Sequence, residues 1–288
     1  MNIDQIADLP AVRRSSLLRK GIAFLREPAA ALERRRISDS QYQGHPPVFA
    51  NSLPKSGTHL LLQVTRALPE ARYLGRFIAT SPSVTLRQRS PAALARRISR
   101  ILPSETLGSH LHYSPEAAAA LARINALHLF IYRDPRDVLV SEAHYLGEMN
   151  RWHRMHRHFA RLPGSRERLQ LALDGFDSRY PECNARLLPY AGWLQDPGTL
   201  AIRYEDLAGA GQEAQLARII AGFAARSSAA AGSPEALLET LKSAIAPSKS
   251  HTFRRGGSGK WRDGLSAQEA AGLTRRLRPS LQAFGYSE

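Results

Sequence analysis

From Pro47 onward, short apolar runs alternate with longer segments in which apolar residues recur every third or fourth position. Short apolar runs are typical of buried strands, and the wider spacing is typical of amphipathic helices. Strands that alternate with helices predict an α/β fold with a central, mostly parallel sheet flanked by helices. We expect strands at 48–50, near 105–109, at 127–133 and at 199–207, and helices at 114–127, 212–228 and 233–245.

The segment before this pattern is rich in Ala and Arg, and it carries Leu17, Leu18, Ile22 and Leu25 at helical spacing. A basic amphipathic helix can lie on an anionic membrane. It can also pack on the main domain with its arginines in solvent, which we prefer because runs of charge are usually solvated faces. The predicted organisation is a basic helical extension over residues 1–45 and one domain over 46–288.

The composition is that of an ordinary globular protein, with 43% hydrophobic and 23% charged residues in a chain of 288. The formal net charge of +15 favours anionic partners, such as nucleic acid, an acidic membrane surface or a phosphorylated small molecule. Cys183 is the single cysteine, which excludes an intramolecular disulfide. No apolar run reaches the roughly 18 residues of a membrane span, and the start lacks the order of a secretory signal. We therefore expect a cytoplasmic protein.

The segment PVFANSLPKSGTHLL joins a predicted strand to a predicted helix through a polar turn, Lys55 to Thr58. The first N–H groups of a helix lie at the positive end of its dipole and can bind a phosphate. A lysine adds charge there, and hydroxyl groups add directional donors. The spacing fails the Walker pattern, because no second glycine stands four residues before a GK[ST] triplet. By itself, this turn is either a phosphate site or an ordinary connection.

A second segment, YRDPRDVLVS, brings Arg133 to the end of an apolar strand and Ser141 onto the next helix. Ligands of open α/β sheets bind at the carboxyl ends of the strands, so these two side chains can hold a second phosphate. The alternative is a local ion pair of Arg133 with Asp134 or Asp137.

A third segment, HTFRRGGSGKWRDGLS, combines Arg254 and Arg255 with closely spaced glycines that begin at Gly256. Its backbone can approach an anion closely, and Trp261 offers a flat stacking face. Proteins that bind nucleic acid carry such loops too, so this segment alone is not specific.

In this order, the three segments resemble the motifs of the sulfotransferase family that uses 3'-phosphoadenosine 5'-phosphosulfate (PAPS). PKSGTHL is similar to its 5'-phosphosulfate loop, YRDPRDVLVS to its 3'-phosphate motif and FRRGGSGKWR to its C-terminal RKGxxGxWK loop. The resemblance implies a P-loop-like nucleotide-binding fold with PAPS as co-substrate. It places Lys55, Ser56, Gly57, Thr58 and His59 around the 5'-phosphosulfate, Arg133, Ser141, Arg254, Arg255 and Gly256 around the 3'-phosphate, and Tyr204 against the adenine.

The family's general base is a histidine in a KTHLP-like stretch, to which LGSHLHYSP is similar. The resemblance therefore assigns the base to His110, and a shift in the alignment would give His112 instead. A histidine can accept the proton of an acceptor hydroxyl as the sulfuryl group arrives. Lys55 would stabilise the charge on the leaving oxygen. Without the resemblance, His110 is an ordinary partly buried histidine.

The chain departs from the family pattern at several positions. Gly108 stands where the family has a lysine two residues before the base, so a second cation is missing or comes from elsewhere. His59 and Leu60 replace a common Thr and Trp, and Lys260 replaces the Asp of GDW. The shape of the acceptor pocket therefore cannot be inferred from the mammalian cytosolic enzymes.

The segment 144–162 is rich in His and Arg. No spacing in it matches the common zinc patterns, and sulfuryl transfer needs no metal, so we expect none. The segment is either a basic lid over the acceptor pocket, with Trp152 and Phe159 as apolar contacts, or a solvated helix face.

The predicted function is transfer of the sulfuryl group of PAPS to a hydroxyl, or less readily an amine, of a small-molecule, glycan or lipid acceptor. We expect no nucleic-acid partner and consider a homodimer and peripheral membrane contact open. Two alternatives are a nucleotide-dependent kinase of related fold, which would need magnesium and ATP, and a non-enzymatic protein that binds anions or nucleic acid, with salt-sensitive binding and no turnover.

Overall fold

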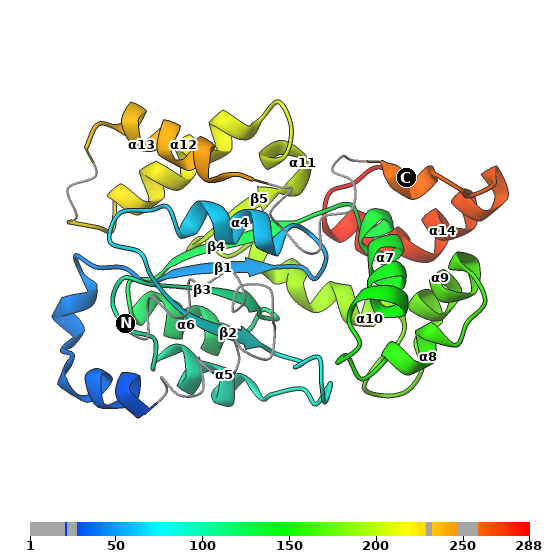
Figure 1. Ribbon diagram of the computed structural model, residues 1–288, viewed down its shortest axis with the longest axis horizontal. Coiled ribbons are helices and arrows are strands. Elements are labelled where there is room, and N and C mark those ends of the chain that lie inside the picture. Colours follow the sequence, from blue (N-terminus) through cyan, green and yellow to red (C-terminus); the bar gives the residue numbers. More distant parts are fainter. Residues whose placement is uncertain (1–20, 22–27, 229–231, 247–258) are drawn as a thin grey trace.

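The computed structural model describes residue 21 and residues 28–228, 232–246 and 259–288 of the chain. In this part of the chain, five parallel strands form one sheet in the order β2-β3-β1-β4-β5, with helices on both faces (Figure 1). The predicted α/β fold with a parallel sheet is confirmed. The strands are β1 (Val48–Ser52), β2 (Arg72–Ala79), β3 (Glu105–His110), β4 (Leu127–Tyr132) and β5 (Thr199–Arg203).

Two differences separate the predicted strands from the observed ones. β5 ends earlier than predicted, because Tyr204–Leu207 turns directly into the short helix α11. β2 was not predicted, because Gly75 and Arg76 interrupt its apolar pattern. Arg76 is nevertheless buried, where its Nε lies 3.3 Å from Oε1 of Glu105 on β3. At this position β2 therefore buries an ion pair with β3, whereas an apolar residue would have fitted the strand pattern.

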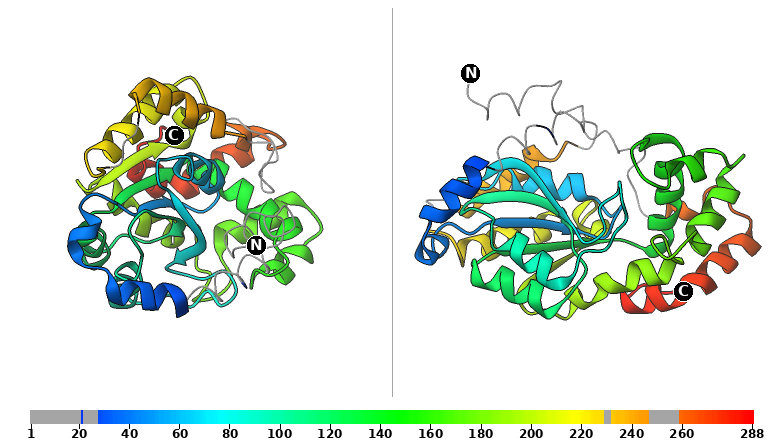
Figure 2. Two further views of the ribbon diagram at one scale, coloured as in Figure 1. Left: turned by 60° about the vertical axis from the view of Figure 1, so that its left-hand side comes forward. Right: turned by 90° about the horizontal axis from the view of Figure 1, so that it is seen from below.

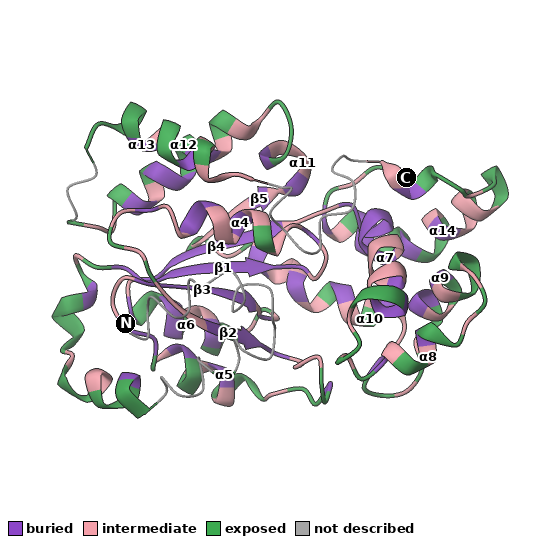
Figure 3. Ribbon diagram, viewed as in Figure 1, coloured by how far each residue is buried: buried purple, intermediate pink, exposed green. Residues whose placement is uncertain are grey.

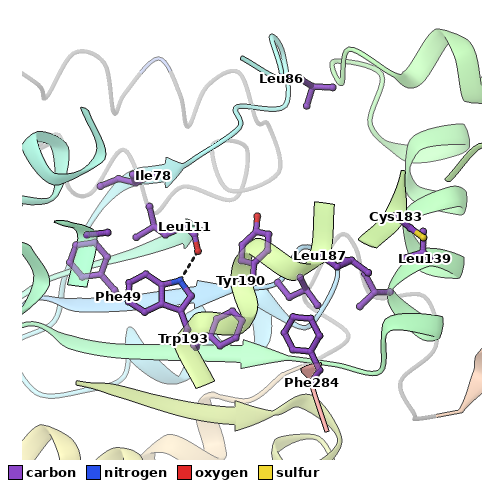
Figure 4. Packing of buried hydrophobic residues seen from close by; sticks show 14 of the residues in the cluster. Phe49, Ile78, Leu86, Leu111, Leu139, Cys183, Leu187, Tyr190, Trp193 and Phe284 are labelled. Carbon is purple, nitrogen blue, oxygen red and sulfur yellow. Dashed lines mark hydrogen bonds between the residues drawn. The ribbon is translucent and has the colours of Figure 1, made fainter. Parts of the chain in front are cut away.

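Side chains of a strand point alternately to its two faces, and this divides the core into two layers. On one face, Phe49 and Phe130 pack with Trp193, whose indole N–H donates to the Leu111 carbonyl (2.8 Å; Figure 4). On the other face, Leu129 packs against the second layer. Parallel sheets are typically covered on both faces in this way, and Figure 3 shows the central strands largely buried. The first layer includes α5 (Pro91–Ile98), α6 (Pro115–Arg123) and η3 (Leu188–Leu194); the second includes α4 (Thr58–Thr65), α12 (Gln212–Ala224) and α13 (Pro234–Ala244).

A group of helices gathers beyond the carboxyl ends of the strands, at the right of Figure 1 and in the right-hand view of Figure 2. We call it the helical lobe. It begins at the end of β4, so the turns that leave β1 and β4 face it (Figure 1). The lobe consists of α7 (Pro135–His144), the π-helix η2 (Tyr145–Met149), α8 (His156–Ala160), α9 (Ser165–Asp174), α10 (Cys183–Leu187), the 3-10 helix η5 (Lys260–Arg262) and α14 (Ala267–Ala283).

Residues 28–36 are helical and lead into η1 (Asp39–Tyr42). The Arg34 guanidinium donates to the Ser99 carbonyl (3.0 Å), and the Tyr42 hydroxyl donates to the Ile101 carbonyl (2.6 Å). This part of the predicted extension therefore packs beside α5, whereas most of the predicted amphipathic helix around Leu17 lies outside the described residues. None of the helices that the structure describes is both long enough and apolar enough to cross a membrane.

Candidate active site

The turn between β1 and α4 has an unusual backbone. Lys55 has a φ of 67° and Gly57 a φ of 99°, so two residues of one short turn are left-handed. A lysine rarely adopts this conformation, and such residues cluster at functional sites. Gly57 is required for a second reason, because a Cβ there would lie 2.7 Å from Cδ2 of Tyr204. The turn therefore depends on its glycine for both conformation and space.

This turn has the donors that an anion needs. Helix α4 begins at Thr58, and its first backbone N–H groups have no acceptor within the helix. The Ser56 hydroxyl is fully buried and has no hydrogen-bond partner within the described structure. A buried polar group without a partner is costly, and an anion bound at the helix start would satisfy it. The residues of the turn thus fit a phosphate or sulfate group.

A chain of hydrogen bonds joins this turn to the end of β3. Ser52 Oγ lies 2.7 Å from Thr58 Oγ1 and 3.1 Å from Nδ1 of His110. Nearby, the Asn51 carboxamide oxygen accepts from the Leu111 backbone N–H (2.8 Å). The ends of β1 and β3 are thereby held together on both sides of His110.

His110 is half-buried and has a defined orientation. Its Nδ1 lies 2.9 Å from the Ser52 carbonyl oxygen, which can only accept, so Nδ1 carries the proton and Nε2 has the lone pair. Burial, followed by the nearby positive charge of Lys55 and His112, lowers the pKa of His110 to about 4, although its hydrogen bond to Ser52 opposes this shift. The ring is therefore neutral at pH 7 and able to accept a proton at Nε2.

His112 occupies a different environment, although it follows His110 by only two residues. Its backbone N–H donates to Thr80 Oγ1 (2.9 Å), and its ring meets the Tyr190 ring edge-on, with 4.7 Å between the centroids. Burial lowers the pKa of His112 to about 4 as well. None of these contacts involves Ser52 or the Lys55 turn, so the two histidines differ in the groups that hold their rings.

The side chain of Lys55 lies against the helical lobe. Its Nζ is 3.7 Å from the centroid of the Tyr145 ring, at the start of η2. Burial lowers the pKa of Lys55 to about 8, with Arg133 acting in the same direction and Glu142 opposing it. Lys55 is thus a cation at neutral pH, and it lies close to the C-terminal end of α7, where η2 begins.

Arg133 forms the local ion pair that the sequence analysis gave as an alternative. Its Nη2 lies 3.4 Å from Oδ2 of Asp137, and its guanidinium stacks over the Tyr204 ring at 4.7 Å. Tyr204 is buried and also borders Gly57, so the structure brings the first turn, Arg133 and Tyr204 together. Arg133 lies just before α7, and Ser141 lies one turn after Asp137 on that helix, on the same side as Asp137.

Asp137 joins this cluster to the C-terminal part of the chain. Its carboxylate accepts from the backbone N–H groups of Gly259 (3.0 Å) and Trp261 (2.9 Å). The predicted phosphate ligands Arg254, Arg255 and Gly256 lie outside the described residues.

Three residues that the sequence analysis did not select therefore complete the site. Ser52 was visible only as a polar residue at the end of an apolar strand, Asp137 only as a competitor for Arg133, and Tyr145 only as part of a histidine-rich segment. Phe159, expected to contact the acceptor pocket, is instead fully buried in the core of the lobe, because its ring packs on Tyr180. Trp152 of the same segment is 61% exposed, and His59 of the first turn is also exposed.

A family model for the sulfotransferase domain matches residues 45–285. Among solved structures, the mouse sulfotransferase SULT7A1 complexed with PAP is similar, with a TM-score of 0.56 and 19% sequence identity over 84% of this chain and 88% of that chain. At this identity the similarity concerns the fold. No curated protein sequence matches this chain.

Proposed function

Because the chain belongs to the sulfotransferase family, we propose that it transfers the sulfuryl group of PAPS to a hydroxyl of a small-molecule, glycan or lipid acceptor, with His110 as the base and Lys55 as the cation at the leaving oxygen. The observation that carries the proposal is the hydrogen bond from His110 Nδ1 to the Ser52 carbonyl (2.9 Å). It fixes the imidazole at the end of β3 against the end of β1, from which the cationic turn leaves, and it leaves Nε2 as the basic nitrogen.

The residues present fit the nucleotide co-substrate. The buried Ser56 hydroxyl without a partner and the positive end of the α4 dipole suit the 5'-phosphosulfate, with Lys55, Gly57, Thr58 and His59 around it. Arg133 and Ser141 suit the 3'-phosphate, and Tyr204, which lies beside Arg133 and Gly57, suits the adenine. We assign Arg254, Arg255 and Gly256 to the 3'-phosphate by the resemblance of their segment alone.

PAPS supplies an activated sulfuryl group whose bond to the phosphate oxygen is the one that breaks. His110 accepts the proton of the acceptor hydroxyl at Nε2 while the acceptor oxygen bonds to sulfur. Lys55 neutralises the negative charge that develops on the departing phosphate oxygen, and adenosine 3',5'-bisphosphate leaves. The ends of β1 and β3 hold His110 and Lys55 in place, and such positioning lowers the activation barrier.

The test is transfer of label from PAPS to a panel of hydroxyl acceptors that includes phenols, sugars and lipids, with amines for comparison. We expect wild-type product to form without magnesium, and adenosine 3',5'-bisphosphate to raise the melting temperature. Lys55→Ala and His110→Ala should each reduce turnover by about 100-fold, the usual scale for one charge-stabilising or proton-accepting group.

His112→Ala is the matched control, because it removes a histidine of similar burial two residues away. If His112→Ala abolishes turnover and His110→Ala does not, the assignment of the base is wrong. If no product forms with any acceptor while ATP and magnesium yield a phosphorylated one, the kinase alternative replaces this proposal.

A further inference from the structure

Gly108 lies on β3 two residues before His110, and the space above it is filled by an aromatic ring. A Cβ at position 108 would lie 2.8 Å from Cε2 and 2.9 Å from Cδ2 of Phe77, and 3.1 Å from Cδ1 of Leu62. Such distances are shorter than real Cβ contacts, and a lysine in this place would need Phe77 to move. The ring of Phe77 can therefore occupy this place only because position 108 has no side chain.

The ring of Phe77 also contacts the proposed base. The centroids of Phe77 and His110 are 4.9 Å apart, and their planes meet at 71°, an edge-to-face geometry that stabilises aromatic pairs. Phe77 reaches this place because β2 shifts register against β3 between Tyr73 and Phe77. One part of the ring contacts His110, and the ring remains 48% exposed.

The other neighbours of His110 are polar or charged, and they contact its ring differently from Phe77. Ser52 holds Nδ1 through its carbonyl, and Thr58 is linked to Ser52 through the hydroxyl groups. Lys55 and His112 are the charged and titratable groups that act on His110. These contacts hold the polar side of the imidazole, whereas Phe77 is the aromatic ring that packs against it.

We propose that Phe77 is a positioning residue for His110, and that Gly108 is required because its lack of a side chain leaves room for the Phe77 ring. The ring keeps water from the imidazole and holds it against the Ser52 carbonyl. The site thus has an apolar group where related enzymes are expected to have a cation, and the charge at the sulfuryl group comes from Lys55. The role in catalysis rests on the proposed function, but the contact between the two rings does not.

The first experiment titrates His110 by NMR in the whole protein without nucleotide. Phe77→Ala admits water to the ring, so we expect the His110 midpoint to rise from near pH 4 toward the ordinary value, about 6.5. Phe77→Leu should restore most of the low midpoint because it keeps apolar bulk. Phe176→Ala is the matched control: Phe176 is similarly exposed (54%) and contacts a different histidine, His158, at 4.1 Å. An unchanged His110 midpoint in Phe77→Ala would overturn the proposal.

The second experiment is a double-mutant cycle at positions 77 and 108. Gly108→Ala should displace the ring and shift the His110 titration as Phe77→Ala does, but should add nothing in the Phe77→Ala background, because the displaced group is already gone. We expect kcat to fall about tenfold in each single variant, with the acid limb of the pH profile moved to higher pH. Fully additive effects would contradict the shared mechanism.

Retained binding of adenosine 3',5'-bisphosphate shows that each variant is folded. If the titration shifts as expected but no variant, including wild type, transfers sulfuryl, the positioning contact stands and the proposed function fails.

Discussion

Lys55 and His110 are both half-buried, and burial lowers the pKa of each, yet at neutral pH each keeps the protonation state that its proposed task requires. With a pKa of about 8, Lys55 is a cation at neutral pH but lies near the limit of that state. With a pKa of about 4, His110 is neutral and has a free Nε2 at the same pH. The two groups are therefore in complementary protonation states between roughly pH 4 and pH 8.

The pH profile of kcat/KM tests this pair at the residue scale. Lys55 loses its charge as the pH rises through about 8, so kcat/KM should decline above that pH. Lys55→Arg should extend the plateau to higher pH, because a guanidinium stays charged, although its different shape lowers the maximum. A wild-type profile that stays flat to pH 10 would contradict the role of Lys55 as the essential cation.

Among the elements, α7 connects the proposed nucleotide side of the site to the C-terminal part of the chain. Its first turn contains Asp137, which is 3% exposed and accepts from two backbone N–H groups of the segment that leads into η5. The same carboxylate pairs with Arg133. One buried side chain therefore joins Arg133, four residues earlier, to Gly259, 122 residues later in the chain.

Asp137→Asn should be strongly destabilising, by about 3 kcal/mol, because it leaves Arg133 without its buried partner and weakens the hydrogen bonds to the C-terminal segment. Urea unfolding followed by circular dichroism measures this loss. Asp174→Asn is the control, because Asp174 forms an exposed pair with Arg276 and should cost less than about 1 kcal/mol. Equal losses in the two variants would show that Asp137 does not anchor these segments.

The π-helix η2 continues α7 and presents Tyr145 to Lys55. Single π-helical turns within helices are frequent at functional sites. Here the altered helix places an aromatic ring within 3.7 Å of the ammonium group, a contact that stabilises the charged form of the lysine.

Tyr145→Leu should therefore lower the pKa of Lys55 further and move the basic limb of the kcat/KM profile to lower pH, with a loss of about 3- to 30-fold at pH 8. Tyr145→Phe keeps the ring and should resemble wild type. If Tyr145→Phe is as impaired as Tyr145→Leu, the hydroxyl rather than the ring face is what matters.

At the scale of the whole molecule, the sheet buries a histidine in its interior. His128 on β4 is 1% exposed, its Nδ1 lies 2.8 Å from Thr199 Oγ1, and its ring packs on Trp193 with centroids 4.3 Å apart. Burial lowers the pKa of His128 to about 3. The fold as a whole therefore keeps this side chain neutral in a place where its charge cannot be solvated.

Acid should destabilise the protein for this reason. The unfolded chain binds a proton at His128 near pH 6.5, whereas the folded protein binds it only near pH 3, so stability is lost as the pH falls between these values. The slope contributed by His128 is at most about 1.4 kcal/mol per pH unit. The melting temperature measured from pH 7 to pH 4 should fall more steeply in wild type than in His128→Asn, while His158→Asn, which removes a histidine outside the sheet, should match wild type. Parallel curves for all three would contradict this account.

Hydrophobic periodicity and turn chemistry are local properties, so the class of fold, most of the strands and the polar turn at Lys55 could be predicted from the sequence. It also placed Arg133 and His110 at strand ends. It missed β2, since that strand is an edge whose buried Arg76 depends on Glu105 of another strand.

Contacts between residues far apart in sequence determine which groups lie together in the site. His110 differs from His112 because Ser52, 58 residues earlier in the chain, holds its Nδ1. Phe77 can contact His110 because Gly108 leaves the space, and Asp137 reaches Gly259 across 122 residues. These contacts depend on how the strands are ordered and how the lobe packs on them. A local pattern contains the chemistry of each residue, but the orientation of a side chain and its pKa are set by neighbours that folding alone brings near.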